Sequence, residues 1–187
     1  EVVAALPFNL TDGQRRAAWQ IIQDLVLDHP MYRLLYGEVG SGKTAVAMIA
    51  ASTVCQAGSQ VIWLNPTVIL AAQQAETLRQ TFAPLGLKVA LVRAGTKENH
   101  LDADIIVGTH ALLNPKIAFK KIGLIIIDEQ HRFGVEQRQT ILERHPATNL
   151  LMMSATPIPR SLAQSIFGHL DITYLLDKPV HQKPIKT

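Results

Sequence analysis

The stretch from Gly37 to Thr44 constrains the fold more than any other part of the chain. It reads Gly-Glu-Val-Gly-Ser-Gly-Lys-Thr, which fits the phosphate-loop pattern of a glycine, four residues of any type, and Gly-Lys-Ser or Gly-Lys-Thr. An apolar run at 31–36 precedes it, and a run at 45–57 rich in Ala, Ile, Val and Met follows it up to Gly58. This order predicts a strand, a tight loop and a helix. In that setting the loop N–H groups and the helix N-terminus bind phosphate together.

Each residue type in this loop has a predicted task. Glycines let the backbone approach phosphate oxygens without a Cβ in the way. The Lys43 ammonium is predicted to reach the β- and γ-phosphates, and the Thr44 hydroxyl to bind Mg²⁺. The loop alone is compatible with an NTP hydrolase and with a small-molecule kinase. The predicted nucleotide-binding residues are Gly37, Glu38, Val39, Gly40, Ser41, Gly42, Lys43 and Thr44.

Apolar runs and helical patterns alternate along the rest of the chain. Thr11 is a predicted N-cap for a helix at 12–26, whose apolar residues follow helical spacing. The alternation predicts an α/β fold, with a mostly parallel, doubly wound sheet flanked by helices. Strands are expected at 31–36, 61–64, 88–92, 105–107, 124–127, 150–153 and 172–175, and helices at 12–26, 45–57, 66–82, 135–144 and 159–167.

Length and composition narrow the class of protein. A chain of 187 residues with 48% hydrophobic residues suits one globular domain, predicted at 1–177. The tail at 178–187, with two prolines and three lysines, is predicted to be a linker. The single cysteine, Cys55, is predicted to be a core residue in a reducing compartment, and no apolar run is long enough to cross a membrane. A net charge of +3 is equally compatible with a nucleic-acid partner and with a solvated surface.

A second group of polar residues follows the continuous apolar run at 124–127. Open α/β sheets bind ligands beyond the carboxyl ends of their strands. Asp128 is therefore predicted to hold Mg²⁺ through water, and Glu129 to orient and deprotonate an attacking water. The alternative is a solvated acidic turn. Together with the phosphate loop, the pair indicates NTP hydrolysis, with Lys43, Asp128 and Glu129 as the catalytic residues.

Several motifs in order then resemble one family. Asp128-Glu129-Gln130-His131 is a DExH box, Ser154-Ala155-Thr156 follows the next predicted strand, and the runs at 132–138 and 156–160 read Arg-Phe-Gly-Val-Glu-Gln-Arg and Thr-Pro-Ile-Pro-Arg. On these motifs the chain resembles, over essentially its whole length, the first RecA-like motor lobe of the RecG-type superfamily 2 helicases. Those are bacterial ATP-dependent DNA helicases that remodel branched DNA in recombination and repair. The resemblance implies a RecA-like P-loop NTPase domain, ATP and Mg²⁺ as cofactors, DNA as a partner and a cytoplasmic location.

The resemblance also implies roles for residues outside the two motifs. It assigns adenine recognition to Phe8, Leu10 and Gln14, because a Gln amide can both donate to and accept from an adenine edge. It assigns the coupling of γ-phosphate occupancy to lobe movement to Gln130, His131, Ser154 and Thr156. It assigns DNA-backbone contacts to Pro66, Thr67, Gly95, Thr96, Thr109 and His110.

Residue chemistry alone leaves simpler interpretations of these positions open. Gln14 could be a solvated first-turn residue, Thr67 and Thr109 could be ordinary N-caps, and Ser154 and Thr156 could be structural. Between residues 93 and 104 the chain is shorter than the family pattern. The DNA contact assigned to Gly95 and Thr96 falls within this shortened segment.

The resemblance further implies partners beyond this stretch of sequence. A second RecA-like lobe would supply an arginine finger, and a wedge domain would recognise branch points. Because such an arginine contributes about 10³- to 10⁵-fold to turnover, the chain alone is expected to hydrolyse ATP weakly. Two alternatives remain at this point: the motor lobe of a transcription-repair coupling translocase, and a nucleotide-gated DNA-binding module without hydrolysis.

Overall fold

Seven strands form one sheet in this computed structural model, which describes residues 2–6, 9–93, 100–114, 117–128, 144, 146–156 and 170–176. The sheet order is β3-β4-β2-β5-β6-β1-β7, and every neighbouring pair is parallel. The predicted α/β fold is confirmed, with a sheet that is parallel throughout. The strands are β1 (Tyr32–Gly37), β2 (Gln60–Leu64), β3 (Val89–Val92), β4 (Ile105–Gly108), β5 (Ile122–Ile127), β6 (Asn149–Ser154) and β7 (Asp171–Leu175).

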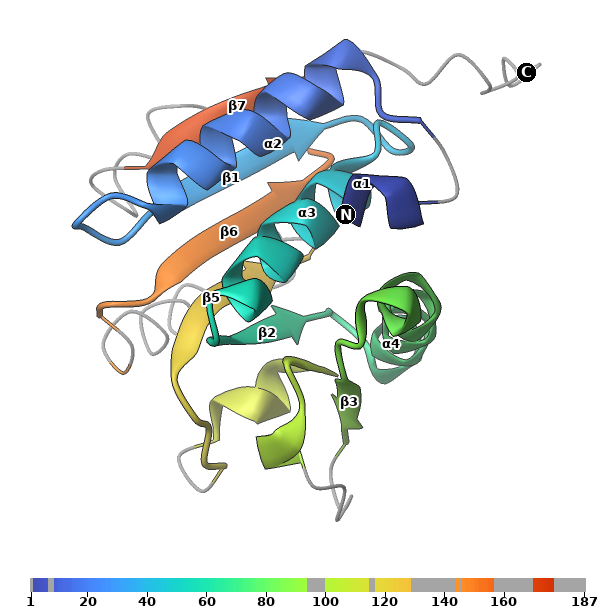
Figure 1. Cartoon of the computed structure of the whole chain (residues 1–187), viewed down its shortest axis with the longest axis vertical. Coiled ribbons are helices and arrows are strands. Elements are labelled where there is room, and N and C mark those ends of the chain that lie inside the picture. Colours follow the sequence, from blue (N-terminus) through green and yellow to red (C-terminus); the bar gives the residue numbers. More distant parts are fainter. Residues whose placement is uncertain are drawn as a thin grey trace.

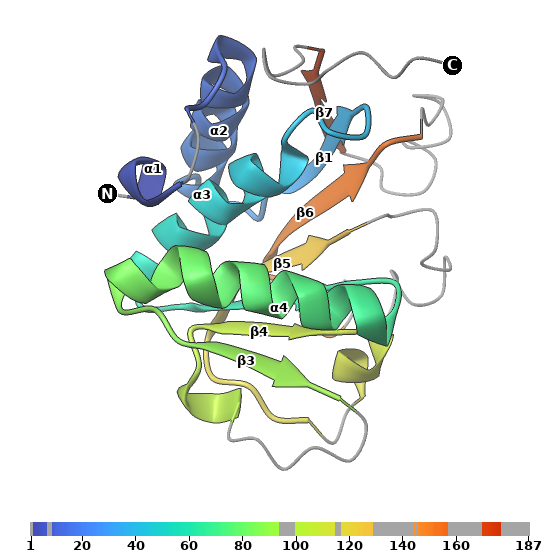
Figure 2. The same ribbon diagram turned by 90° about the vertical axis from the view of Figure 1, so that its right-hand side faces the viewer.

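The four α-helices of the described residues lie on one side of this sheet (Figures 1 and 2). The expected helices at 135–144 and 159–167 lie outside the described residues, apart from Arg144. None of the helices in the described ranges is long and apolar enough to cross a membrane. The helices are α1 (Val2–Ala5), α2 (Asp12–Leu25), α3 (Lys43–Gln56) and α4 (Val68–Phe82), with short 3₁₀ turns η1 (Ala83–Leu85), η2 (His100–Asp102) and η3 (His110–Leu113).

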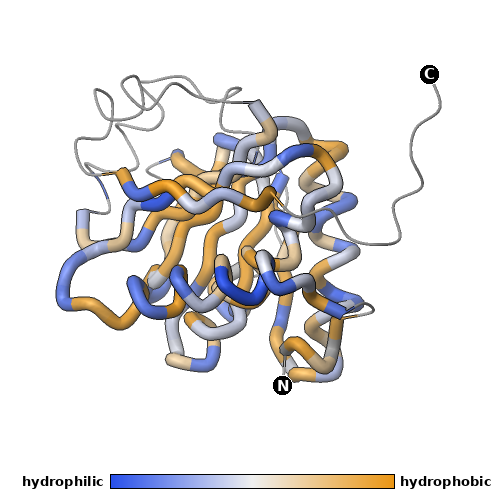
Figure 3. Tube along the Cα trace, turned by 90° about the horizontal axis from the view of Figure 1, so that it is seen from above, coloured by the Kyte–Doolittle hydropathy of each residue, from blue (hydrophilic) through white to orange (hydrophobic). Residues whose placement is uncertain are grey.

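The strands contribute apolar side chains to both faces of the sheet. Successive side chains of a strand point to opposite faces; Trp63, for example, belongs to the cluster under the helices, whereas Ile62 belongs to the cluster on the other face. Figure 3 shows the central strands mostly in the hydrophobic colour. Burial on both faces explains why β5 reads as a continuous run of Leu and Ile rather than as an alternating pattern.

Helix α2 begins with a capping box. The Thr11 hydroxyl accepts a hydrogen bond from the Gln14 N–H at 3.2 Å, and the Gln14 side-chain oxygen accepts one from the Thr11 N–H at 2.9 Å. This reciprocal pair satisfies donors that a helix N-terminus otherwise leaves free. The predicted N-cap at Thr11 is confirmed.

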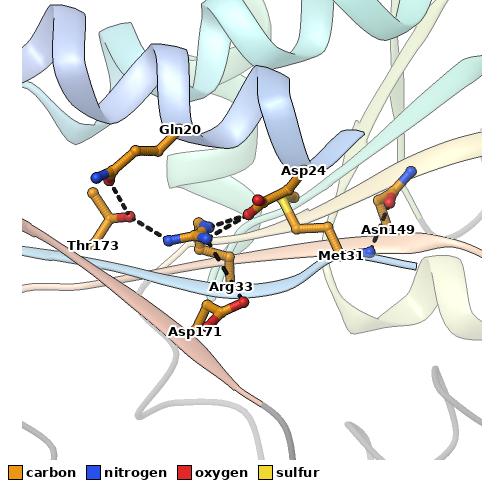
Figure 4. A network of polar contacts seen from close by, with 7 residues as sticks. All are labelled: Gln20, Asp24, Met31, Arg33, Asn149, Asp171 and Thr173. Carbon is orange, nitrogen blue, oxygen red and sulfur yellow. Dashed lines mark hydrogen bonds and ion pairs between the residues drawn. The ribbon is translucent and has the colours of Figure 1, made fainter. Parts of the chain in front are cut away.

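Arg33 joins α2 and the edge strand β7 to β1 (Figure 4). Its guanidinium contacts the Asp24 carboxylate at 2.6 Å and the Thr173 hydroxyl at 2.7 Å, and it lies 3.6 Å from Asp171. The Thr173 hydroxyl in turn donates to the Gln20 side chain at 3.1 Å. Among the described strands only β1 pairs with β7, so this network is a second attachment for the edge strand.

Cys55 lies buried in α3. Burial, and secondarily the nearby Asp104 carboxylate, raises the pKa of its thiol to about 12. The thiol is therefore neutral at physiological pH, which agrees with the predicted role of a small core residue.

Candidate nucleotide-binding site

Five strand ends place four polar residues and the first glycine of the phosphate loop along one edge of the sheet. The carboxyl ends of β1, β6, β5, β2 and β4 lead into Gly37, Ser154, Asp128, Asn65 and Thr109, respectively. Neighbouring strands lie about 4.8 Å apart, and β6 separates β1 from β5, so the axes of these two strands are about 10 Å apart. The phosphate loop and Asp128 therefore lie on either side of the end of β6.

Two glycines give the loop its shape. Gly40 and Gly42 have φ angles of 81° and 86°, in the left-handed region that glycine tolerates best. Gly42 is the N-cap of α3, and Lys43 and Thr44 are the first two residues of that helix. A Cβ at Gly37 would lie 2.5 Å from the Ser41 hydroxyl oxygen, so the beginning of the loop is also closely packed. The loop thus turns tightly onto the N-terminus of α3, as a phosphate-binding loop must.

Lys43 folds back over the loop. Its ammonium donates to the carbonyl oxygens of Gly37 at 2.6 Å and Glu38 at 3.0 Å. The positive charge therefore lies at the entrance of the loop, where a bound phosphate would meet it.

Gln14 connects α2 to the loop. Its side-chain nitrogen donates to the Ser41 carbonyl oxygen at 2.8 Å, and the residue is only 2% exposed. Gln14 is therefore not a solvated first-turn residue. Among the described residues its amide bonds to Thr11 and Ser41, which leaves one hydrogen and one lone pair. Its contact with adenine stays a prediction.

We expect Gly42→Ala to damage both stability and nucleotide binding. A Cβ at Gly42 would lie 2.2 Å from the Gln14 side-chain nitrogen, and the φ of 86° is strained for alanine. The strained backbone alone costs about 1–3 kcal/mol. Denaturant unfolding and titration with an ATP analogue check both effects.

Gly58 offers the matched control for that substitution. Its φ of 76° is also left-handed, but a Cβ there would meet nothing within 4 Å. Gly58→Ala should therefore lower the free energy of unfolding only by the cost of the strained backbone. It should bind nucleotide as the unchanged chain does. Equal nucleotide affinity in the two variants would contradict the account of Gly42.

Asp128 and Asn65 follow neighbouring strands in register. Leu64 and Ile127 are partners, the Asp128 N–H donates to the Leu64 carbonyl at 2.9 Å, and the Asn65 side-chain nitrogen lies 3.5 Å from an Asp128 carboxylate oxygen. Asn65 was not among the residues predicted from the sequence. The available signal was its position, since a polar residue directly after the apolar strand β2 corresponds to Asp128 after β5.

Ser154 and Thr156 lie together at the end of β6. Their hydroxyl oxygens are 3.0 Å apart, and the Thr156 N–H donates to the Ser154 hydroxyl at 3.2 Å. Ser154 is fully buried between the strand carrying the loop and the strand carrying Asp128. This place suits the coupling role predicted for the pair, which stays a prediction.

Thr67 caps helix α4 and Thr109 caps the 3₁₀ turn η3, directly after the neighbouring strands β2 and β4. The Thr67 hydroxyl accepts from the Leu70 N–H at 3.2 Å, and the Thr109 hydroxyl accepts from the Ala111 N–H at 3.4 Å. Both are thus N-caps. Pro66 beside Thr67 is half-buried, and His110 beside Thr109 is exposed.

The remaining predicted residues fall into two groups. Leu10 is buried in the cluster under the helices. Phe8, Gly95, Thr96, Glu129, Gln130 and His131 lie outside the described residues.

The residues at this edge fit a magnesium nucleotide. Mg²⁺ prefers oxygen ligands and is commonly held by one or two carboxylates together with substrate phosphates. The Thr44 hydroxyl and the Asp128 carboxylate supply such oxygens. The glycine loop leading into the N-terminus of α3 supplies a site for the phosphates.

Comparisons with known proteins agree with the motifs. A DEAD/DEAH box helicase family model matches residues 11–165. The ATP-dependent DNA helicases RecG of Thermotoga maritima and Staphylococcus epidermidis are 41% and 44% identical to the chain, which is covered completely in both comparisons. A solved structure of RecG bound to a three-way DNA junction matches 97% of the chain with a TM-score of 0.81 and 38% identity.

The matched proteins are much longer than this chain, which spans 25% and 29% of the two RecG relatives and 26% of the RecG chain in the solved structure. The alignment with the Thermotoga protein extends over 197 positions against 187 residues, so that relative has additional residues within the matched region. The family model spans both the phosphate loop and Asp128. The chain belongs to the DEAD/DEAH box helicase family.

Proposed function

We propose that the chain is the first motor lobe of an ATP-dependent DNA helicase of the RecG type, which remodels branched DNA. The observation that carries this proposal is the arrangement of the sheet edge. A phosphate loop with two left-handed glycines and Lys43 over its entrance is separated from Asp128 by a single intervening strand, β6.

The roles proposed at this edge follow from the chemistry of each group. The loop N–H groups and Lys43 bind the β- and γ-phosphates, while Thr44 and Asp128 hold the magnesium ion. When bound, the ion neutralises charge on the phosphates. Glu129 orients the attacking water and accepts its proton. Gln14, already in contact with the loop at Ser41, recognises adenine with Phe8 and Leu10.

The neighbouring strand ends would contact DNA. Pro66 and Thr67 follow β2, and Thr109 and His110 follow the adjacent strand β4. Gly95 and Thr96 follow β3 in the sequence. A helix N-terminus with a free N–H suits a phosphate oxygen. The solved RecG structure bound to a three-way DNA junction supports DNA as the partner.

The greater length of the relatives supports a division of labour in the whole protein. We infer a motor domain at 1–177 and a linker at 178–187 that leads to a second RecA-like lobe, with a branch-recognising wedge domain elsewhere and a location in the bacterial cytoplasm. Gln130, His131, Ser154 and Thr156 would couple the γ-phosphate to movement between the lobes. The RecG relatives do not favour a transcription-repair translocase or a module without hydrolysis.

Steady-state ATP turnover with and without forked DNA tests this function. The chain alone should bind Mg-ATP with very little turnover, whereas the longer protein with both lobes should show turnover that forked DNA stimulates more than linear duplex. Fast turnover by the monomeric chain alone would contradict the two-lobe arrangement. Equal stimulation by forked and linear DNA would contradict the preference for branches.

A further inference from the structure

Asn65 is a buried polar residue beside the carboxylate proposed to hold magnesium. It is 1% exposed, and its side-chain nitrogen lies 3.5 Å from Oδ2 of Asp128. An ionised carboxylate only accepts hydrogen bonds, so the amide nitrogen is the atom that can face it. The two residues also occupy equivalent positions, each one residue beyond the end of neighbouring strands.

The backbone of both residues is held by hydrogen bonds that continue the sheet. The Asn65 N–H donates to the Gly108 carbonyl at 2.8 Å, and the Asp128 N–H donates to the Leu64 carbonyl at 2.9 Å. With both backbones held, the direction of the Asp128 carboxylate depends on its side-chain torsions. A donor 3.5 Å from one of its oxygens favours one of those orientations.

The amide oxygen of Asn65 distinguishes this residue from a structural asparagine. Oδ1 is buried and has no hydrogen-bond partner among the residues that the structure describes. Asn149 at the beginning of β6 shows the usual arrangement, since its Oδ1 accepts from the Met31 N–H and its Nδ2 donates to the Gly123 carbonyl, both at 2.8 Å. Buried polar atoms are generally paired, and the exceptions call for an explanation such as a catalytic role.

We propose that Asn65 is a positioning residue for magnesium, which it affects through Asp128. By donating to Oδ2, it stabilises the orientation in which the carboxylate binds the water shell of the ion. The 3.5 Å separation is long for a hydrogen bond, and such contacts often tighten when the substrate complex forms. This inference rests on the proposed function, because it takes the site to be one for a magnesium nucleotide.

The Mg²⁺ dependence of nucleotide binding tests the proposal without relying on hydrolysis. The probe is a fluorescent, non-hydrolysable ATP analogue, titrated with Mg²⁺ and also measured in excess EDTA. Asn65→Ala should raise the half-saturating Mg²⁺ concentration about tenfold, in line with the loss of other groups that orient metal ligands. Its affinity for the analogue in EDTA should stay unchanged.

Asn149→Ala is the matched control, because it removes a paired amide at the opposite edge of the sheet. It should lower the unfolding temperature but leave the half-saturating Mg²⁺ concentration unchanged. If Asn65→Ala does not fold, the same titration is made with Asn65→Ser. Its shorter side chain cannot reach Asp128 as the amide does, so it should also raise the half-saturating Mg²⁺ concentration.

Two results separate a failure of this inference from a failure of the proposed function. If Asp128→Ala changes the Mg²⁺ dependence and the folded Asn65 variant does not, the positioning role is wrong and the nucleotide site stands. If the unchanged chain does not bind the analogue with Mg²⁺, the proposed function is wrong, and the role of Asn65 falls with it.

Discussion

Glu129→Gln is expected to lower ATP hydrolysis by about 10²- to 10⁴-fold, the usual contribution of a general base. Glutamine keeps the size and polarity of the side chain but cannot accept a proton from water. Binding of Mg-ATP should therefore remain close to that of the unchanged protein. The measurement is steady-state turnover of the longer protein with both lobes, together with titration of a non-hydrolysable ATP analogue.

Glu76→Gln is the control for that substitution. Glu76 is exposed on α4 and accepts a hydrogen bond from the Gln80 side chain at 2.9 Å. The same change of charge there should leave turnover unaltered. The base role of Glu129 would be contradicted if its variant lost binding and turnover equally, or if it retained turnover.

Lys43→Ala is expected to weaken Mg-ATP binding by about 10- to 100-fold, because hydrogen bonds to charged groups contribute about 1.5–3 kcal/mol. The Lys43 ammonium already lies at the loop, on the carbonyl oxygens of Gly37 and Glu38. In the complex it should move to the phosphates. Titration with a fluorescent ATP analogue measures the loss, and thermal unfolding shows whether the variant is folded.

Lys120→Ala removes the same charge at an exposed position. Lys120 pairs with Asp102 at 3.2 Å, and both side chains are largely exposed, so the pair adds about 0–1 kcal/mol to stability at most. This variant should bind nucleotide normally. A folded Lys43→Ala variant with unchanged affinity would show that the loop does not bind phosphate through this lysine.

The sequence predicted those parts of the site that depend on local pattern. The loop at Gly37 to Thr44 was recognisable because only glycine readily tolerates the backbone angles observed at Gly40 and Gly42. Strand β5 was recognisable because a strand buried on both faces is apolar at nearly every position. The cap at Thr11 was recognisable because a capping box is made by residues three positions apart.

Contacts between distant segments could not be predicted in the same way. The bond from Gln14 to Ser41 spans 27 positions, and the one from Asn65 to Asp128 spans 63. The first depends on the packing of α2 against α3, and the second on the pairing of β2 with β5. The turn η3 after β4 was missed for another reason, because four residues are too few to show helical periodicity.

The most direct test of the account is a crystal structure of the chain with Mg²⁺ and a non-hydrolysable ATP analogue. The β- and γ-phosphates should lie inside the loop from Gly37 to Thr44, with the Lys43 ammonium moved from the carbonyl oxygens onto them. The metal should lie between Thr44 and Asp128. Phosphates bound elsewhere, or a metal remote from Asp128, would contradict the account.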